Sequence, residues 1–191
     1  EGFAGLGGEV VHTEAVAPET RDFRSTVTTM SGQDVQALYL ATFYSDAAVL
    51  AQQMASTGFD VPVLTNSSLF NPELVELGQE AVEGWYVATN FLPEDTAPEV
   101  TEFVSAYEAE YGTTPDQFAA IAYDTLAVLT TAMGQVVAED GSIDKEELRD
   151  ALYEIEHAGA SGTIDFDEQG DVRKEMTYLQ IVDGEFVPVE G

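Results

Sequence analysis

Residues Gly32 to Asn71 read GQDVQALYLATFYSDAAVLAQQMASTGFDVPVLTNSSLFN, and this stretch decides the fold class. Ala37–Ala41 is a short apolar run of strand length, and Val61–Leu64 is a second one. Between them, the alanine-rich segment Ala47–Met54 has the composition of a helix. A strand–helix–strand unit of this kind joins two neighbouring parallel strands, so the stretch predicts an α/β fold with a parallel sheet flanked by helices.

Residues on either side of the predicted helix fit its two ends. Ser45 and Asp46 are N-cap candidates, because their side-chain oxygens can accept a backbone hydrogen bond from the first turn. Gly58 is suited to end the helix, since glycine tolerates the left-handed conformation of a C-cap.

Polar and aromatic residues follow both predicted strands. In open α/β sheets, ligands bind in the crevice beyond the carboxyl ends of the strands. A pocket there needs an apolar wall and a few hydrogen-bonding groups, and the five candidates are Phe43, Tyr44, Asn66, Ser67 and Ser68. In the alternative interpretation, Phe43 packs under the helix and the serines are loop or capping residues.

The rest of the chain continues with strand and helix patterns. The segment Asp116–Val137 is apolar on several sides, which predicts a buried helix, and Leu92–Pro98 is a candidate connection between two lobes. Glu1–Leu6 resembles the end of a helix that begins earlier, so we expect the gene product to extend further toward its N-terminus. The other predicted strands are Val10–Val16, Gly84–Phe91, Thr163–Phe166, Met176–Val182 and Phe186–Val189, and the other predicted helices are Asp22–Met30, one starting at Asn71-Pro72, Val100–Tyr111 and Glu146–Glu156.

The charge of the chain is extreme, with 36 acidic residues, 6 basic residues and a formal net charge of −30. Nucleic acid is therefore an unsuitable partner, because binding it requires clustered Lys and Arg, and an anionic membrane surface is unsuitable for the same reason. Dispersed acidity favours adaptation to high salt, where self-repulsion is screened; an ordinary acidic exported protein is the alternative. No apolar run reaches the ~18 residues of a membrane span, so we expect no membrane insertion.

The residues of a catalytic centre are not recognisable. His12 and His157 have no neighbouring Asp or Cys in the sequence, and the chain has no Cys. Two acidic stretches partly match calcium loops, but Asp165–Val172 is better interpreted as a polar turn and Asp140–Leu148 as a helix start. Asp144 and Glu147 have capping-box spacing there, and Ser142 is the alternative cap. We therefore expect no enzyme activity, no cofactor and no metal.

Several short motifs together resemble one family. In order, they are GGEVV (7–11) with DF (22–23), ALYLATFYSDAAVLAQQM (37–54), GWYVATNF (84–91), a YG..PD…AYD pattern from Tyr111 to Asp124, a G…FD..GD turn from Gly162 to Asp171, and the hairpin DGEFV (183–187). Their order and spacing resemble the C-terminal half of the type I periplasmic binding proteins of branched-chain amino acid transporters.

The resemblance implies two lobes joined by hinge strands, with the N-terminal half of the family fold missing. It places residues 1–90 in the C-terminal lobe, residues 91–165 in a helical part of the other lobe, and residues 166–191 in a terminal hairpin that returns to the first. By position, it makes Phe43 a pocket aromatic and Phe118 an apolar contact of the ligand, and Ser67 stands where amino-acid binders have a glutamate for the ammonium group.

The resemblance also implies a function. We expect an extracytoplasmic solute-binding protein of an ABC importer, periplasmic or extracellular, which binds a small polar or carboxylate ligand and docks on an ABC permease; a lipid anchor of the intact protein is left open. Further expected partners are the missing N-terminal half or a second copy of the chain. The rival hypothesis is a ligand-sensing regulatory domain on the same fold.

Overall fold

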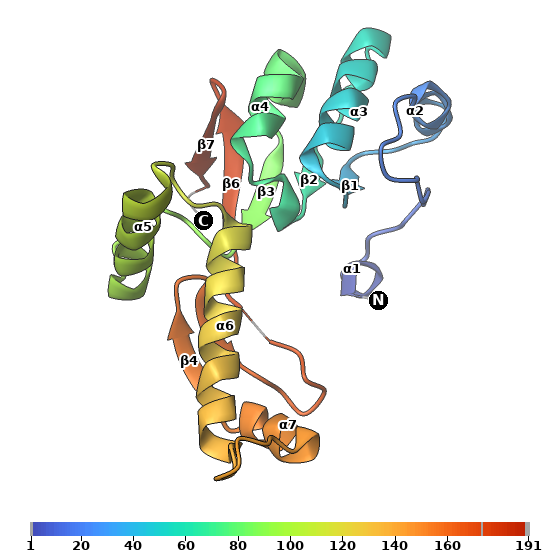
Figure 1. Ribbon diagram of the computed structural model, residues 1–191. Helices are drawn as coiled ribbons and strands as arrows, with labels where there is room; N and C mark the ends of the chain where they lie inside the picture. The colour runs from blue at the N-terminus through green and yellow to red at the C-terminus, as the bar shows by residue number, and fades with distance from the viewer. Residues whose placement is uncertain (1, 173, 190–191) are drawn as a thin grey trace. The chain divides into compact units, whose positions relative to one another are not determined.

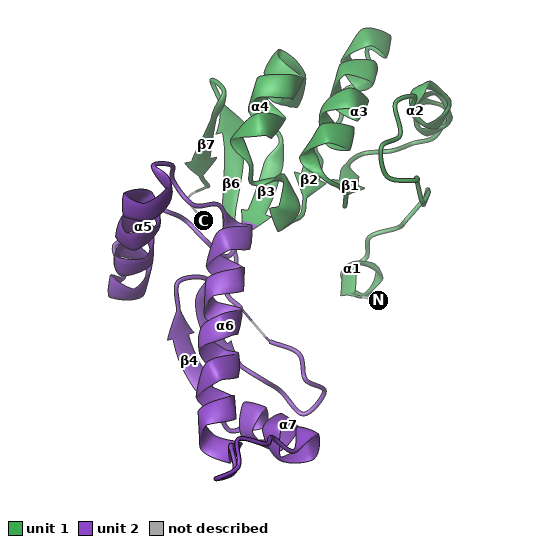
Figure 2. Cartoon of the chain, viewed as in Figure 1, with its two compact units in different colours: residues 1–88, 178–191 green, residues 89–177 purple. Residues whose placement is uncertain are grey.

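A computed structural model describes residues 2–172 and 174–189 of the 191-residue chain. The chain folds into two compact units (Figure 2): unit 1 comprises residues 1–88 and 178–191, and unit 2 comprises residues 89–177. The predicted boundaries after residues 90 and 165 describe the lobes of a complete binding protein, and they stay a prediction.

A mixed sheet forms the centre of unit 1 (Figure 1). The pairs β1–β2 and β2–β3 are parallel, and β6–β7 is an antiparallel hairpin. The N–H of Ile181 in β6 donates to the carbonyl of Trp85, the residue before β3, which joins the hairpin to the parallel part. The strand order is β1-β2-β3-β6-β7, with β1 at Leu38–Leu40, β2 at Val63–Thr65, β3 at Tyr86–Thr89, β6 at Thr177–Val182 and β7 at Glu185–Pro188.

The helices of unit 1 that follow residue 23 pack on one face of this sheet. Inward residues of the strands, such as Val63, Val87 and Ile181, form one apolar core with buried residues of the helices. The helical elements are α1 (Gly2–Gly5), α2 (Arg24–Ser31), α3 (Tyr44–Thr57), η1 (Ser67–Leu69), α4 (Pro72–Gly78) and η2 (Gln79–Val82). The parallel α/β arrangement predicted from residues 32–71 is confirmed.

The ends of the helices follow local chemistry, with one correction. Asn71 caps α4 by accepting the Glu73 N–H at 2.8 Å, and Pro72 follows at the first helical position as predicted. Gly58 ends α3 in the left-handed conformation, with φ +70°. The predicted N-caps Ser45 and Asp46 are wrong: α3 begins at Tyr44 and its N-cap is Phe43, which forms no side-chain cap bond.

The prediction of a strand at Val10–Val16 is wrong. These residues form no strand, although the helix predicted after them is present as α2. Among the described residues, no backbone hydrogen bond joins this segment to another strand, and Val10 is 67% exposed. A segment becomes a β-strand only when its backbone forms hydrogen bonds with a neighbouring strand. Its own sequence does not determine whether such a neighbour is present.

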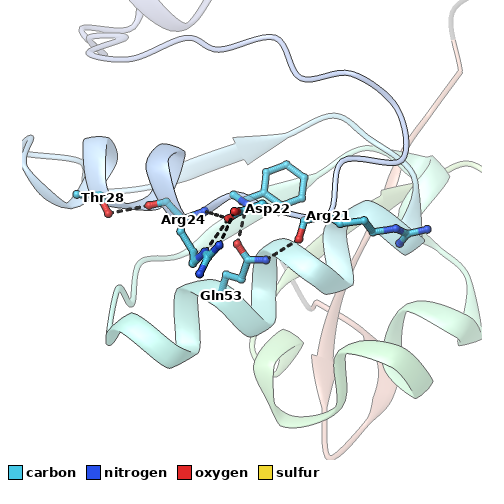
Figure 3. Close-up of polar contacts among 6 residues, drawn as sticks. Arg21, Asp22, Arg24, Thr28 and Gln53 are labelled. Carbon is cyan, nitrogen blue, oxygen red and sulfur yellow. Dashed lines mark hydrogen bonds and ion pairs between the residues drawn. The ribbon is translucent and has the colours of Figure 1, made fainter.

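Side-chain contacts attach α2 to α3 (Figure 3). The Gln53 amide of α3 bridges two backbone groups just before α2, because its Oε1 accepts the Phe23 N–H at 2.6 Å and its Nε2 donates to the Arg21 carbonyl at 3.0 Å. Beside this bridge, the Arg24 guanidinium holds the pKa of Asp22 at about 2. The exposed pair therefore contributes stability above the ordinary pKa of 3.8, and this contribution is lost as pH falls toward 2.

Unit 2 combines helices with a small antiparallel sheet. Buried residues form two apolar clusters, one around Phe91 and Phe103 and the other around Val128 and Ile164. The elements are α5 (Pro98–Tyr111), α6 (Gln117–Val136), α7 (Lys145–Tyr153), β4 (Glu156–Gly159) and β5 (Gly162–Asp165). The helix predicted at Glu146–Glu156 is too long at its C-terminal end, because Glu156 begins β4, a strand that the sequence pattern did not reveal.

A buried carboxylate connects α6 to the β4–β5 turn. Asp124, which is fully buried, accepts the Ala160 N–H at 2.9 Å, the Ser161 N–H at 2.7 Å and the Ser161 hydroxyl at 2.6 Å. The Lys174 ammonium donates to the same Ser161 hydroxyl at 2.6 Å. Burial lowers the pKa of Lys174, and the Asp124 charge partly opposes that effect.

The prediction that α6 is buried nearly all round is wrong for this chain. Four large apolar residues of α6 are exposed, namely Phe118, Ile121, Leu126 and Leu129. The buried residues Ala120, Asp124, Val128 and Ala132 follow one another at intervals of four, so they form a single row along the helix.

Candidate functional site

The carboxyl ends of β1 and β2 lie side by side. Leu40 is the register partner of Thr65, so the two strands end at the same edge of the sheet and the next residues of each continue from there. Thr42 follows β1, and Asn66, Ser67 and Ser68 follow β2.

A small hydrogen-bonded cluster joins these two loops. The Ser68 hydroxyl donates to the Thr42 carbonyl at 2.7 Å, and it lies 2.9 Å from the Asn66 Oδ1. The Thr65 hydroxyl, beneath the cluster, donates to the Tyr86 carbonyl of β3 at 3.1 Å. Polar groups of Thr42, Asn66 and Ser68 therefore lie together at the sheet edge where the sequence predicted a pocket.

Phe43 is positioned by the start of α3. As the N-cap residue it has an extended backbone, with φ −95° and ψ 157°, and its side chain is 58% exposed. The alternative in which Phe43 packs under the helix is therefore not the one observed. An exposed aromatic residue that directly follows Thr42 in the chain offers an apolar surface to a ligand.

Tyr44 has a different environment. Its ring packs against the apolar core of unit 1, and a hydrogen bond from its phenol to the Glu73 carboxylate raises the pKa of Tyr44. Glu73 lies in the first turn of α4. Tyr44 therefore ties α3 to α4, which is a structural role.

The acid nearest to this cluster in the sequence is buried. Asp46, in the first turn of α3, is 3% exposed, and its Oδ2 accepts the Glu19 N–H at 3.1 Å. Its Oδ1 has no hydrogen-bond partner among the described residues. The sequence suggested Asp46 only as a helix cap, because a contact between residues 27 positions apart has no local signal.

The remaining predicted residue belongs to unit 2. Phe118 lies in the first turn of α6, after the N-cap Asp116, whose side chain accepts the Ala119 N–H at 2.9 Å. Its side chain is 46% exposed, as suits a contact residue. A shallow depression of about 550 Å³, also in unit 2, is lined by residues of α6 and α7 and by none of the predicted site residues.

Metal-binding clusters and membrane-spanning helices are both absent from the described part of the chain. No group of three or more His, Asp or Glu side chains is arranged there to hold a metal ion. Asp144 instead caps α7 by accepting the Glu146 and Glu147 N–H groups, as its capping-box spacing predicted. Within residues 2–172 and 174–189, no helix is long and apolar enough to cross a membrane.

Residues 2–185 match the family model described as "Periplasmic binding protein", and the chain belongs to this family. It is 22% identical over 167 residues, 87% of the chain, to the leucine-, isoleucine-, valine-, threonine- and alanine-binding protein of Pseudomonas aeruginosa. Similar solved structures are the leucine-binding protein LivK of Thermotoga maritima (TM-score 0.84, 29% identity, 98% of this chain and 53% of that one) and a Rhodospirillum rubrum protein assigned to branched-chain amino acid ABC transport (TM-score 0.78, 37% identity, 98% and 54%).

All of these matches cover only part of the related protein. The chain spans about half of the curated relatives it matches, 43% of the Pseudomonas protein and 45% of a Leu/Ile/Val-binding protein from Rhizobium johnstonii. The matched part is consistent with the C-terminal half of a type I periplasmic binding protein, as the sequence motifs predicted. Members of the family are solute-binding proteins.

Proposed function

We propose that the complete protein is the solute-binding component of an ABC importer and takes up a small polar or carboxylate ligand. The observation that supports this most directly is the cluster of Thr42, Asn66 and Ser68, together with the exposed Phe43, which follows Thr42 in the chain. It combines an aromatic wall with placed hydrogen-bonding groups at the carboxyl edge of a parallel sheet.

The proposed ligand class follows from Ser67. An α-amino acid brings an ammonium group, and burying this charge without a carboxylate partner is costly. Ser67 has no such charge, and the carboxylate of Asp46, the acid nearest to the cluster in the sequence, is buried. An uncharged ligand or an organic anion therefore suits this half of the pocket better than a branched-chain amino acid.

The remaining parts of the proposal concern the cellular setting. By analogy with the relatives, the protein would act outside the cytoplasm, close two lobes on its ligand in a hinge motion and deliver it to a permease. It would have no catalytic role. These statements rest on family membership and apply to the complete protein.

A ligand panel tests the proposed class. Isothermal titration calorimetry of the complete protein would compare leucine with benzoate, as an aromatic carboxylate, and urea, as an uncharged amide. We expect benzoate or urea to bind at least tenfold more tightly than leucine. Tighter binding of leucine would refute the ligand class, and binding of none of the three would count against the proposed site.

Phe43 is the residue to substitute first. If the ring forms a wall of the pocket, Phe43→Ala removes an apolar contact of about 1.5–3 kcal/mol and weakens ligand binding about 10–100-fold. Because the side chain is 58% exposed, we expect the free energy of unfolding to change by only about 0.5 kcal/mol. Phe23→Ala is the control for loss of a buried ring. Because Phe23 is 3% exposed, this variant should lose about 3–5 kcal/mol in the free energy of unfolding. Unchanged affinity in Phe43→Ala would remove this residue from the site.

A further inference from the structure

Glu19 has a backbone conformation that its residue type disfavours. Its φ is +63°, in the left-handed region where the Cβ of an L-residue crowds the following carbonyl. Pro18 and Glu19 form a turn, and turns with proline followed by a positive φ usually have glycine or asparagine at that second position. Strain of this kind persists only where the surrounding structure enforces it, and it gathers at functional sites.

Two other described non-glycine residues have positive φ, and both have local explanations. Gln79 is the C-cap residue of α4, a position at which helices often leave the right-handed region. Asp183 lies in the turn between β6 and β7, and aspartate tolerates the left-handed conformation better than most residues. Glu19 is neither a helix cap nor a residue type that suits the conformation.

A buried carboxylate enforces the conformation of Glu19. The Oδ2 of Asp46 accepts the Glu19 N–H at 3.1 Å, and Asp46 is 3% exposed, with no partner for its Oδ1 among the described residues. Burying a carboxylate whose second oxygen lacks a hydrogen bond is unfavourable. Two unfavourable features, a strained glutamate and a buried acid, are therefore in direct contact.

Contacts along α3 place Glu19 at the end of this helix that carries the candidate site. Asp46 lies in the first turn, and its N–H donates to the carbonyl of the N-cap residue Phe43. Gln53, which is seven residues and about 10 Å further along the helix, binds backbone groups of residues 21 and 23 (Figure 3). The chain therefore runs beside α3 with Glu19 at the N-terminal end, where Phe43 is also located.

The side chain of Glu19 is exposed, and it forms no hydrogen bond or ion pair with the described residues. Glycine would relieve the backbone strain, so the conformation alone does not explain a glutamate. From these observations we propose that Glu19 is a specificity-determining residue of the ligand site, whose carboxylate accepts a hydrogen bond from an N–H group of the ligand.

This assignment rests on the proposed function and narrows its ligand class. A hydrogen bond from an N–H group to a charged carboxylate is stronger than one between neutral groups, which favours an uncharged ligand with N–H donors, such as an amide or urea. An organic anion would instead meet a like charge. Within the class inferred from Ser67, Glu19 therefore selects the uncharged ligands.

Isothermal titration calorimetry of the complete protein tests this contact. Urea and benzoate would be titrated at 0.1 M KCl, where charges within about 10 Å still interact. We expect Glu19→Gln to bind urea at least about fivefold more weakly and benzoate at least about threefold more tightly than the wild type. Asp60→Asn is the matched control, because Asp60 is also an exposed acid of unit 1 but precedes β2, at the opposite edge of the sheet; it should change neither affinity.

The results separate this assignment from the proposed function. If Glu19→Gln leaves both affinities unchanged while Phe43→Ala weakens them, the role of Glu19 is refuted and the proposed site stands. If the wild type prefers leucine and Glu19→Gln weakens leucine binding at least about tenfold, the carboxylate meets an ammonium group. That result would support Glu19 as an N–H acceptor and refute the uncharged or anionic ligand class. Binding of none of the three ligands would overturn both proposals.

Thermal unfolding of the complete protein measures the strain separately from the ligand contact. Glu19→Gly should raise the melting temperature by about 1–2 °C, because glycine adopts a positive φ without crowding. Glu19→Ala keeps the strain and removes the carboxylate, so it should leave the melting temperature unchanged and alter the urea and benzoate affinities as Glu19→Gln does. A lower melting temperature in both variants would show that the glutamate side chain stabilises the turn itself, and would overturn the proposal.

Discussion

Asp124 shows how much of this fold depends on single buried groups that lie far apart in the sequence. Its carboxylate accepts three hydrogen bonds from residues 36 and 37 positions away, and a Cβ added at Gly159 would collide with it. The sequence motif AYD included Asp124 without indicating this role, since no local pattern reports a contact over that distance. That Thr42 and Asn66 to Ser68 lie at one edge of the sheet was easier to predict, because the carboxyl ends of adjacent parallel strands meet by topology alone.

Replacing Asp124 with Asn should destabilise the chain strongly. The substitution removes the negative charge, leaves Lys174 without its compensating carboxylate, and places amide hydrogens opposite N–H donors. Breaking a buried charged network by changing one partner costs roughly 3–5 kcal/mol, to be measured by urea denaturation. Asp116→Asn is the control in the same helix, because Asn and Asp are nearly equal as N-caps. A loss below about 1 kcal/mol for Asp124→Asn would show that the network contributes little.

At the scale of elements, sequence patterns predicted those whose determinants are local. Asn71 caps α4 and Gly58 ends α3, and in the hairpin after Ile181 Asp183 and Gly184 adopt the positive φ values that a tight turn needs. The predictions for two other segments failed for opposite reasons. The Val10–Val16 segment has a strand sequence without a partner, whereas β4 has a partner but a sequence, EHAG, with little strand propensity.

Two glycines provide an element-scale prediction with opposite signs. Gly58 ends α3 at φ +70° with nothing within 4 Å of an added Cβ, so Gly58→Ala should cost about 1–2 kcal/mol through backbone strain alone. Gly134 lies inside α6, also with free space around it, and Gly134→Ala should stabilise by about 0.5–1 kcal/mol through helix propensity. Urea denaturation of the two variants checks both values. If the two changes had the same sign, the distinction between cap and helix interior would fail.

At the scale of the whole molecule, the distribution of charge has the largest consequence for stability. The chain has 36 acidic residues and 6 basic ones. The described arginine ion pairs, Arg24–Asp22 and Arg149–Asp150, are exposed and join residues close together in the sequence. Exposed pairs of this kind contribute little stability. Salt therefore has few favourable interactions to weaken, and it has a large net repulsion between carboxylates to relieve.

This balance predicts that the melting temperature rises with KCl. The Debye length falls from ~10 Å at 0.1 M salt to ~3 Å at 1 M, so most of the increase should occur below about 1 M, and differential scanning calorimetry from 0.1 to 3 M KCl would record it. Sucrose is the control, since it stabilises by exclusion from the surface without screening charge; its effect should rise gradually with concentration and show no early plateau. A melting temperature that stays constant or falls with KCl would favour an ordinary acidic exported protein, in which the net charge maintains solubility and the fold does not depend on salt.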